Sequence, residues 1–173
     1  MKLKRNVFLI GPRACGKTSV GQLLAGRLGA AFIDTDHELV ASVGMEIADY
    51  IEAEGWDVFR DAESGVLARV AEEEPRVIGC GGGIVLRTAN RDILKSGIVL
   101  YLKAEPEELA ARLARDPNEA QRPSLTGKPI VEEVREVLAE RAPLYEGCAD
   151  AIVSGDTLET VVDRALVEVE RLS

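Results

Sequence analysis

A glycine-rich loop near the N-terminus constrains the fold of this chain more than any other feature. Residues 11–18 read Gly-Pro-Arg-Ala-Cys-Gly-Lys-Thr and fit the pattern G-x-x-x-x-G-K-[ST] in full. The apolar run 7–10 precedes the loop, and apolar residues recur at helical spacing after it. A loop with this pattern between a strand and a helix is typical of phosphate binding. Its backbone N–H groups and the positive end of the helix dipole converge on the phosphate oxygens.

The same loop defines the donor side of the expected chemistry. Lys17 should bridge the β- and γ-phosphates of ATP, and Thr18 should ligate Mg²⁺. Glycine at two positions of the loop lets the backbone approach the phosphates closely. The loop residues that we expect to bind the nucleotide are Gly11, Ala14, Cys15, Gly16, Lys17, Thr18 and Ser19. We expect a phosphotransferase that moves the γ-phosphate of ATP onto the hydroxyl of a small metabolite; the loop fixes the donor, and other motifs must identify the acceptor.

Short apolar runs alternate with helical patterns along the chain. Residues 98–102 are the clearest strand, and the runs 7–10, 31–33, 76–78 and 151–153 also read as strands. Apolar residues recur at helical spacing in four segments. Two of them lie at 59–70 and 158–172, and the other two begin after Lys17 and after Pro106. Strands separated by helices predict an α/β fold with a parallel sheet covered on both faces. The 173 residues suffice for one domain, which we place at 1–173.

Composition excludes several classes of function. The net charge of −9 disfavours binding to nucleic acid or to an anionic membrane, so an anionic substrate must be attracted by local Arg and Lys. Three cysteines without metal-ligand spacing and a single histidine give no support to a zinc site or a Ser-His-Asp triad. No targeting segment is visible in the sequence. We expect a cytoplasmic monomer with reduced thiols.

An acidic pair follows the second predicted strand. Asp34 and Asp36 lie where the chain leaves the carboxyl end of that strand, which is the edge of the sheet where the glycine loop also lies. One carboxylate there can hold Mg²⁺ and the other can accept a proton from a hydroxyl. Because residues i and i+2 of an extended chain share a side, we expect both carboxylates to face one cleft.

Other features have two readings each. Arg60 and Arg141 lie on predicted helices and can be either ligands or solvated surface residues. The glycines at 81–83 follow a strand and fit either a ligand that approaches the backbone or a tight turn. A segment with Pro and Gly but little apolar periodicity runs from about 115 to 129. Such a segment is either a functional flap or disordered, and two well-spaced arginines in it favour a flap.

The order and spacing of these motifs resemble the shikimate kinase family, over residues 7 to 153. The resemblance is carried by the glycine loop, Asp34-Thr35-Asp36, Phe59-Arg60, the glycines at 81–83, Arg122-Pro123 and Arg141 with Leu144-Tyr145. The sequences of the loop and of Leu125-Thr126-Gly127-Lys128-Pro129 are similar to the type II bacterial enzymes. The resemblance implies a three-layer P-loop fold with strand order 2-3-1-4-5 and a mobile lid at about 114–128. The implied reaction converts ATP and shikimate into ADP and 3-phosphoshikimate, in the biosynthesis of aromatic amino acids.

The resemblance also implies a role for each matching residue. Lys17, Asp36 and Arg122 would be catalytic, with Asp36 as the candidate base and Arg122 moving onto the transferring phosphate. Thr18 and Asp34 would hold Mg²⁺. Arg115 and Arg122 would bind ATP, with Arg115 against the adenine and residues 154–158 lining the adenine pocket. The residues implied to bind shikimate are Asp36, Arg60, Gly81, Gly82 and Arg141.

The chain departs from the family pattern at three places. Ala14 replaces a usual glycine, so the loop there needs backbone angles that alanine tolerates. Cys80 replaces a frequent threonine, and no proline follows Thr157 in the adenine loop. None of these changes removes an expected catalytic group. Three alternatives stay open: a gluconate kinase, a nucleoside monophosphate kinase, and a nucleotide-binding regulator without catalysis.

Overall fold

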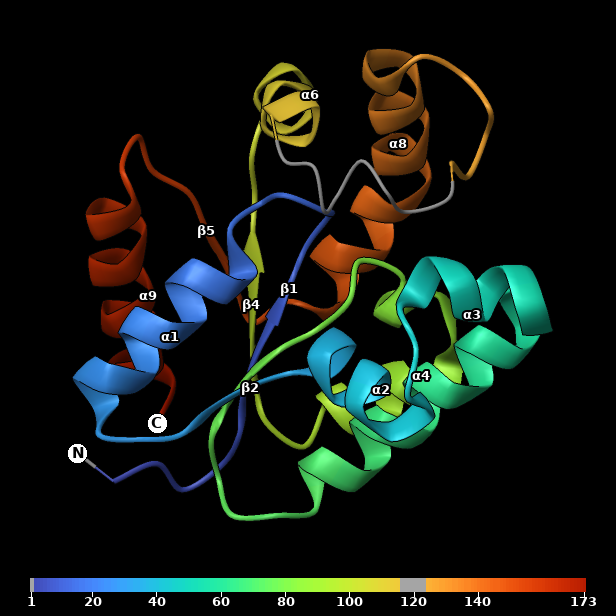
Figure 1. Cartoon of the computed structure of the whole chain (residues 1–173). Helices are drawn as coiled ribbons and strands as arrows, with labels where there is room; N and C mark the ends of the chain where they lie inside the picture. Colours follow the sequence, from blue (N-terminus) through green and yellow to red (C-terminus); the bar gives the residue numbers. More distant parts are fainter. Residues whose placement is uncertain (1, 116–123) are drawn as a thin grey trace.

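A five-stranded parallel sheet forms the centre of the protein (Figure 1). The computed structural model describes residues 2–115 and 124–173. Strand β1 (Val7–Ile10) lies in the middle of the order β2-β3-β1-β4-β5. Its neighbours are β3 (Val77–Gly79) and β4 (Ile98–Leu102), and the edges are β2 (Phe32–Asp34) and β5 (Ala151–Val153). The predicted fold class and strand order are confirmed, with β2 and β3 each starting one residue later than expected.

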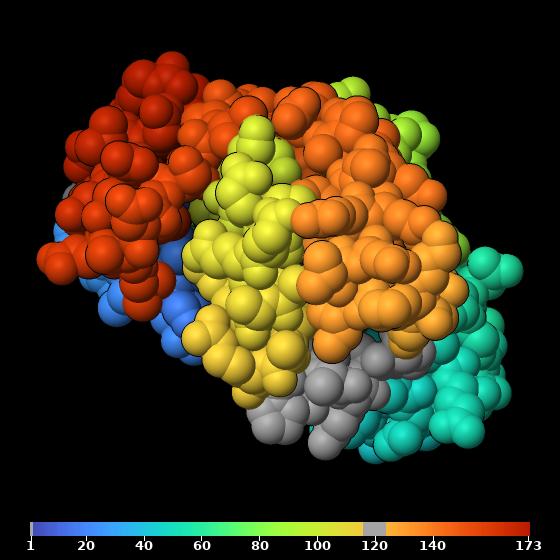
Figure 2. Space-filling model, turned by 90° about the horizontal axis from the view of Figure 1, so that it is seen from above, coloured from blue at the N-terminus to red at the C-terminus, as the bar shows by residue number. Residues whose placement is uncertain are grey.

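Helices cover both faces of the sheet. The helices on one face are α1 (Lys17–Leu28) and α9 (Leu158–Leu172). The helices on the other face are α2 (Thr35–Val43), α3 (Ile47–Glu54), α4 (Trp56–Ala71), α5 (Thr88–Leu94) and α8 (Ile130–Cys148). Helix α6 (Pro106–Arg115) lies beside α8, as Figures 1 and 2 both show.

The central strand explains why both layers form. Val7 and Leu9 pack in the cluster beneath α1 and α9, whereas Phe8 and Ile10 pack in the cluster on the opposite face. All four side chains are fully buried. A continuous apolar run therefore alternates between two cores instead of between core and solvent, which is what a parallel sheet covered on both sides requires.

Three helices were not predicted from the sequence. Helices α2, α3 and α5 are seven to nine residues long, too short for a clear apolar repeat. Helix α2 also begins at Thr35 without any loop, because Asp34 is both the last residue of β2 and the N-cap of α2. Helix α8 continues through Pro143 to Cys148, so Arg141 lies inside this helix.

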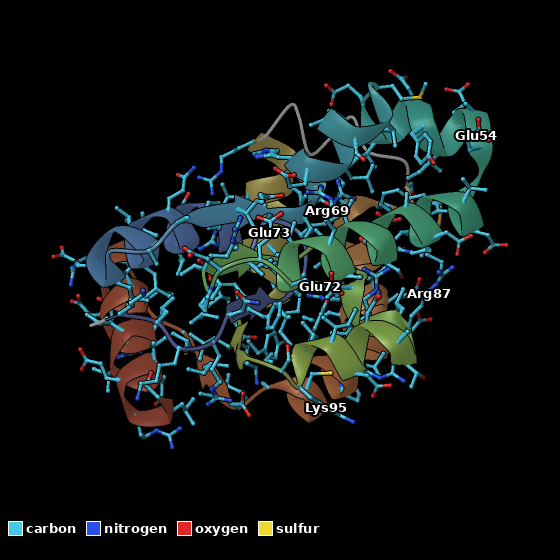
Figure 3. All side chains as sticks on the ribbon, turned by 90° about the horizontal axis from the view of Figure 1, so that it is seen from below. Glu54, Arg69, Glu72, Glu73, Arg87 and Lys95 are labelled. Atoms are coloured by element: carbon cyan, nitrogen blue, oxygen red, sulfur yellow. The ribbon has the colours of Figure 1, made fainter. Side chains whose placement is uncertain are left out.

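Charged side chains pair on the underside of the molecule, away from α6 and α8 (Figure 3). Arg69 of α4 lies 3.0 Å from Glu38 and 3.9 Å from Glu73, and Arg87 lies 2.6 Å from Asp61. These pairs are exposed, so each contributes at most about 1 kcal/mol and the face is an ordinary solvated surface. Within residues 2–115 and 124–173, no helix combines the length and apolarity of a membrane span.

A buried asparagine joins three elements at the amino ends of the strands. The Asn6 side chain donates from Nδ2 to the Ala71 carbonyl at the end of α4, at 3.0 Å. Its Oδ1 accepts from the Arg76 N–H before β3, also at 3.0 Å. The backbone carbonyl of Asn6 accepts from the Ile98 N–H at the start of β4, at 2.8 Å. One residue thus fixes where α4 ends and where two strands begin.

We expect Asn6→Ala to lower the free energy of unfolding by about 1–3 kcal/mol, because it leaves two partly buried backbone groups without partners. Urea denaturation measures this loss. The control is Lys4→Ala, an exposed residue two positions earlier, which should change stability by less than about 0.5 kcal/mol. Equal stability of the two variants would contradict the structural role of Asn6.

Candidate active site

The glycine loop folds around its own lysine. Gly11 and Gly16 have φ angles of 147° and 97°, which only glycine adopts readily. Lys17 Nζ donates to the carbonyls of Gly11, at 2.6 Å, and Pro12, at 2.8 Å. No side chain caps the N-terminus of α1. Its first-turn N–H groups and its dipole therefore remain available for an anion.

Ala14 is strained. It has a φ of 65°, and among the residues that the structure describes it is the only one other than glycine with a positive φ. A left-handed conformation costs a residue with a Cβ about 1–2 kcal/mol. The sequence indicated that the loop needs backbone angles here that alanine tolerates, and Ala14 meets this need by adopting the left-handed conformation. Arg112 Nη1 of α6 donates to the Ala14 carbonyl at 2.9 Å and so supports the strained turn from a distant helix.

The acidic pair, Asp34 and Asp36, lies beside the glycine loop, but its two residues are not in one extended segment as expected. Thr18 Oγ1 donates to Asp34 Oδ2 at 2.9 Å, which joins the two residues expected to hold Mg²⁺. Asp34 Oδ1 accepts from the N–H groups of Asp36 and His37, at 2.9 Å and 3.2 Å, and caps α2. The argument from extended-chain alternation was wrong, because Asp36 lies in the first turn of a helix. Both carboxylates nevertheless line the same cavity.

Two cavities meet beside this pair. The phosphate cavity is lined by residues 13–19 of the loop together with Asp34, Asp36, Cys80, Gly82 and Arg112. The arginine cavity is lined by Arg60, Arg141, Glu63, Trp56 and the glycines at 81–83. Three residues line both cavities: Arg13, Asp36 and Gly82. A group held in one cavity therefore faces a group held in the other across Asp36.

The arginine cavity holds a buried ion pair. Arg60 Nη1 lies 3.0 Å from Glu63 Oε1, and the guanidinium stacks on the Trp56 ring at 5.4 Å from its centroid. Glu63 is only 2% exposed, and burial raises the pKa of its carboxyl above the usual range while Arg60 lowers it. Arg141 from α8 is also buried, at 8% exposure. The lining as a whole carries three arginines, Arg13, Arg60 and Arg141, against two carboxylates, Asp36 and Glu63, and this excess of arginine suits an anionic guest.

Two of the three glycines, Gly81 and Gly83, are explained by the side chains around them. A Cβ on Gly81 would lie 2.8 Å from Glu63 Oε2 and 2.9 Å from Asp36 Oδ1. A Cβ on Gly83 would lie 2.1 Å from Arg60 Nη1. Neither a tight turn nor a ligand is needed to account for these two positions. Charged groups of the site approach the backbone so closely that no side chain fits.

A further cavity lies next to the glycine loop. Residues 155–158, which belong to the segment expected to line the adenine pocket, line this cavity beside Ala14, Cys15 and Ser19. Arg115 is exposed and donates from Nε to the Ala111 carbonyl at 3.2 Å. Arg112, one turn earlier on α6, is the arginine that lines this cavity. Arg122 lies outside the described residues, and so does most of the segment expected to form the lid.

Several residues of the site were missed from the sequence. Glu63 follows Arg60 at i+3, a spacing that usually indicates an exposed helix pair, so only the fold reveals its burial. Arg13 occupies a variable position of the loop motif and gave no signal. Arg112 lines the phosphate cavity, but in the sequence it is simply a basic residue near the end of a helix, where it suits the helix dipole. Cys80 lines the phosphate cavity, and burial raises the pKa of its thiol, which keeps it protonated and unreactive.

Comparison with known proteins gives one consistent result. The family model described as shikimate kinase matches residues 13–170. A shikimate kinase from Nitratidesulfovibrio vulgaris is 50% identical over 151 residues, which cover 87% of this chain and 86% of that protein. A protein named shikimate kinase 2 from Photorhabdus laumondii is 48% identical over 86% of this chain and 85% of its own length.

A solved structure agrees with the sequence matches. Shikimate kinase from Acinetobacter baumannii, in complex with shikimate, superposes with a TM-score of 0.90 at 33% identity. The superposition covers 98% of this chain and 94% of that one. The family model and the identity over most of both chains lead to one conclusion: this chain belongs to the shikimate kinase family.

Proposed function

We propose that this protein transfers the γ-phosphate of ATP to the 3-hydroxyl of shikimate, giving ADP and 3-phosphoshikimate for the biosynthesis of aromatic amino acids. The observation that carries the proposal is the position of Asp36, which lines both the phosphate cavity and the arginine cavity. Family membership supports the same reaction, as does the shikimate bound to the related protein from Acinetobacter baumannii. The catalytic unit is the single domain 1–173, with the lid at about 114–128.

The arginine cavity would hold the acid. Arg60 and Arg141 would each offer a guanidinium fork to the carboxylate of shikimate, a planar group that such forks match well. The backbone of Gly81 and Gly82 would approach the ring hydroxyls, and Asp36 would accept a hydrogen bond from the hydroxyl that reacts. Glu63 would hold Arg60 in place through their 3.0 Å contact.

The phosphate cavity would hold ATP. Lys17 would leave the carbonyls of Gly11 and Pro12 and bind the β- and γ-phosphates, next to the uncapped start of α1. Arg112 would line the path of the nucleotide toward residues 155–158. Arg115 and Arg122 would also bind ATP, as the resemblance to the family implies.

Thr18 and Asp34, where the glycine loop meets the acidic pair, fit a Mg²⁺ site. Thr18 Oγ1 and Asp34 Oδ2 are hard oxygen donors 2.9 Å apart at the edge of the phosphate cavity. Mg²⁺ suits such a site because it keeps several water or phosphate ligands and needs few from the protein. When bound there, it would neutralise charge on the β- and γ-phosphates.

The chain's own groups would then assist the transfer. Asp36 would orient the acceptor hydroxyl and take its proton as the oxygen–phosphorus bond forms. Lys17 would stabilise the charge that collects on the transferring phosphoryl group and on the leaving ADP oxygen, and Arg122 would do so from the lid. Closure of the lid would exclude water, which would otherwise compete as the acceptor.

An acceptor screen tests the proposed function. ADP release by the purified protein should be fast with shikimate and weak or absent with quinate, gluconate and nucleoside monophosphates. The reason is that the arginine cavity is small and is lined for a carboxylate beside ring hydroxyls. Turnover with gluconate or a nucleoside monophosphate, and none with shikimate, would contradict the proposed function. ATP binding without transfer to any acid would favour a regulator instead.

We expect Arg60→Ala and Arg141→Ala each to raise the KM for shikimate about 10- to 100-fold, the loss of a charge-assisted contact, while the KM for ATP changes little. Steady-state kinetics with each substrate varied in turn measures the difference. The matched control is Arg69→Ala, also on α4 but exposed and paired with Glu38, which should leave both constants unchanged. Equal rises in both KM values would argue against a carboxylate role.

We expect Lys17→Ala to lower kcat about 100-fold or more, because it removes the cation aimed at the transferring phosphate. Circular dichroism should show an intact fold. Lys95→Ala, an exposed lysine on the underside of the molecule, should behave as the wild type does (Figure 3). Substantial turnover by the Lys17 variant would mean that the loop is not the donor site.

A further inference from the structure

A buried tyrosine connects helix α8 to the glycine turn. Tyr145 is fully buried, and its hydroxyl donates to the Gly82 carbonyl at 2.5 Å across 63 residues of sequence. The ring packs against Tyr101 of β4 with 5.1 Å between centroids. Gly82 lines both the phosphate cavity and the arginine cavity. Tyr145 therefore holds, from behind, a piece of backbone that both substrates would face.

The same hydroxyl also contacts Arg141. That arginine lies one turn earlier on α8, and its positive charge beside the Tyr145 hydroxyl partly opposes the rise in the pKa of Tyr145 that burial causes. A phenol has a single hydrogen, which here goes to the Gly82 carbonyl, so toward Arg141 the oxygen acts as an acceptor. The hydroxyl is thus a bridge between two groups that line the arginine cavity.

Peptide geometry gives this bridge a consequence. The described part of the chain has no cis peptide bond, so the Gly83 N–H points opposite to the Gly82 carbonyl, away from Tyr145. Within residues 2–115 and 124–173, neither the Gly82 N–H nor the Gly83 N–H has an acceptor. Three consecutive glycines add no stiffness of their own. The Ile84 N–H donates to the Gly81 carbonyl at 3.0 Å and closes the turn, and the bond from Tyr145 adds a direct hold on the peptide that carries the Gly83 N–H.

We propose that Tyr145 is a positioning residue that sets the affinity for the acceptor by holding the Gly82–Gly83 peptide and the Arg141 guanidinium in one arrangement. The inference rests on the proposed function, because it assigns the arginine cavity to the acceptor. It predicts an effect confined to one of the two substrates. A residue that only stabilised the fold would not separate the acceptor from ATP.

The test compares Tyr145→Phe with Tyr101→Phe. Each change removes one hydroxyl from the same buried ring pair, but the Tyr101 hydroxyl makes no hydrogen bond to a described residue. We expect Tyr145→Phe to raise the KM for shikimate about five- to twentyfold, with the KM for ATP within twofold and kcat within threefold of wild type. Tyr101→Phe should change all three constants less than twofold.

Binding at equilibrium gives a second readout. Trp56 is the single tryptophan of the chain and lines the arginine cavity, so its fluorescence should report shikimate binding without turnover. The dissociation constant should rise for Tyr145→Phe by the same factor as the KM. In an Arg141→Ala background, Tyr145→Phe should have a smaller effect than in wild type, because one of its two partners is already gone.

Three results would overturn the inference. They are equal effects of the two phenylalanine variants, equal rises in the KM values for shikimate and ATP, and full additivity of Tyr145→Phe with Arg141→Ala. Failure of the proposed function would look different. The wild type would then turn over another acid and not shikimate, and the same comparison of variants with that acid would still test the role of Tyr145.

Discussion

The parallel pairing of three adjacent strands is the constraint on which the site depends. In the order β2-β3-β1, Leu9 of β1 and Asp34 of β2 both lie opposite Gly79 of β3. The segments that leave these strands are consequently neighbours at one edge of the sheet. They carry the glycine loop, the acidic pair and the glycine turn. Residues far apart in sequence thus enter one cavity without any special loop to bring them there.

The cavities gather positively charged side chains although the chain as a whole is negatively charged. The chain carries a net charge of −9, yet the cavities bring together Arg13, Arg60, Arg141, Lys17 and Arg112. A buried cation is costly unless it is paired. Glu63 supplies that pairing for Arg60, while the partly buried Lys17 donates to backbone carbonyls and the partly buried Arg112 pairs with Glu108 and donates to the Ala14 carbonyl. These partners leave most of the positive charge available to an anion, and glycine at 81 and 83 gives the buried groups the room they need.

The sequence predicts the parts of the site that are local and fails where the fold decides. The glycine loop and the start of α1 follow from a contiguous pattern, and the five strands follow from short apolar runs. Asp34 and Asp36 were placed in the correct cavity by the wrong argument, because a strand that ends in its own helix cap leaves no sign in the sequence. Glu63 and Tyr145 act through burial and through contacts across many residues. Helical spacing cannot distinguish such residues from surface or core positions.

Helices α1 and α8 carry residues of different cavities. Helix α1 carries Lys17 and Thr18, which lie on the phosphate side. Helix α8 carries Arg141 and Tyr145 on the acceptor side, and its Glu133 holds residues 124–126 through contacts of 2.5 Å with Ser124 Oγ and 2.8 Å with the Thr126 N–H.

The two sets meet only at the residues that line both cavities, Arg13, Asp36 and Gly82. Helix α8 packs with Val134 and Leu138 in the cluster of α1 and with Leu144 and Tyr145 in the opposite cluster, so it borders both cores. Under the proposed function, phosphate transfer would depend mainly on residues of the phosphate cavity and the choice of acceptor on residues of the arginine cavity, and Tyr145 contacts the second set through Gly82.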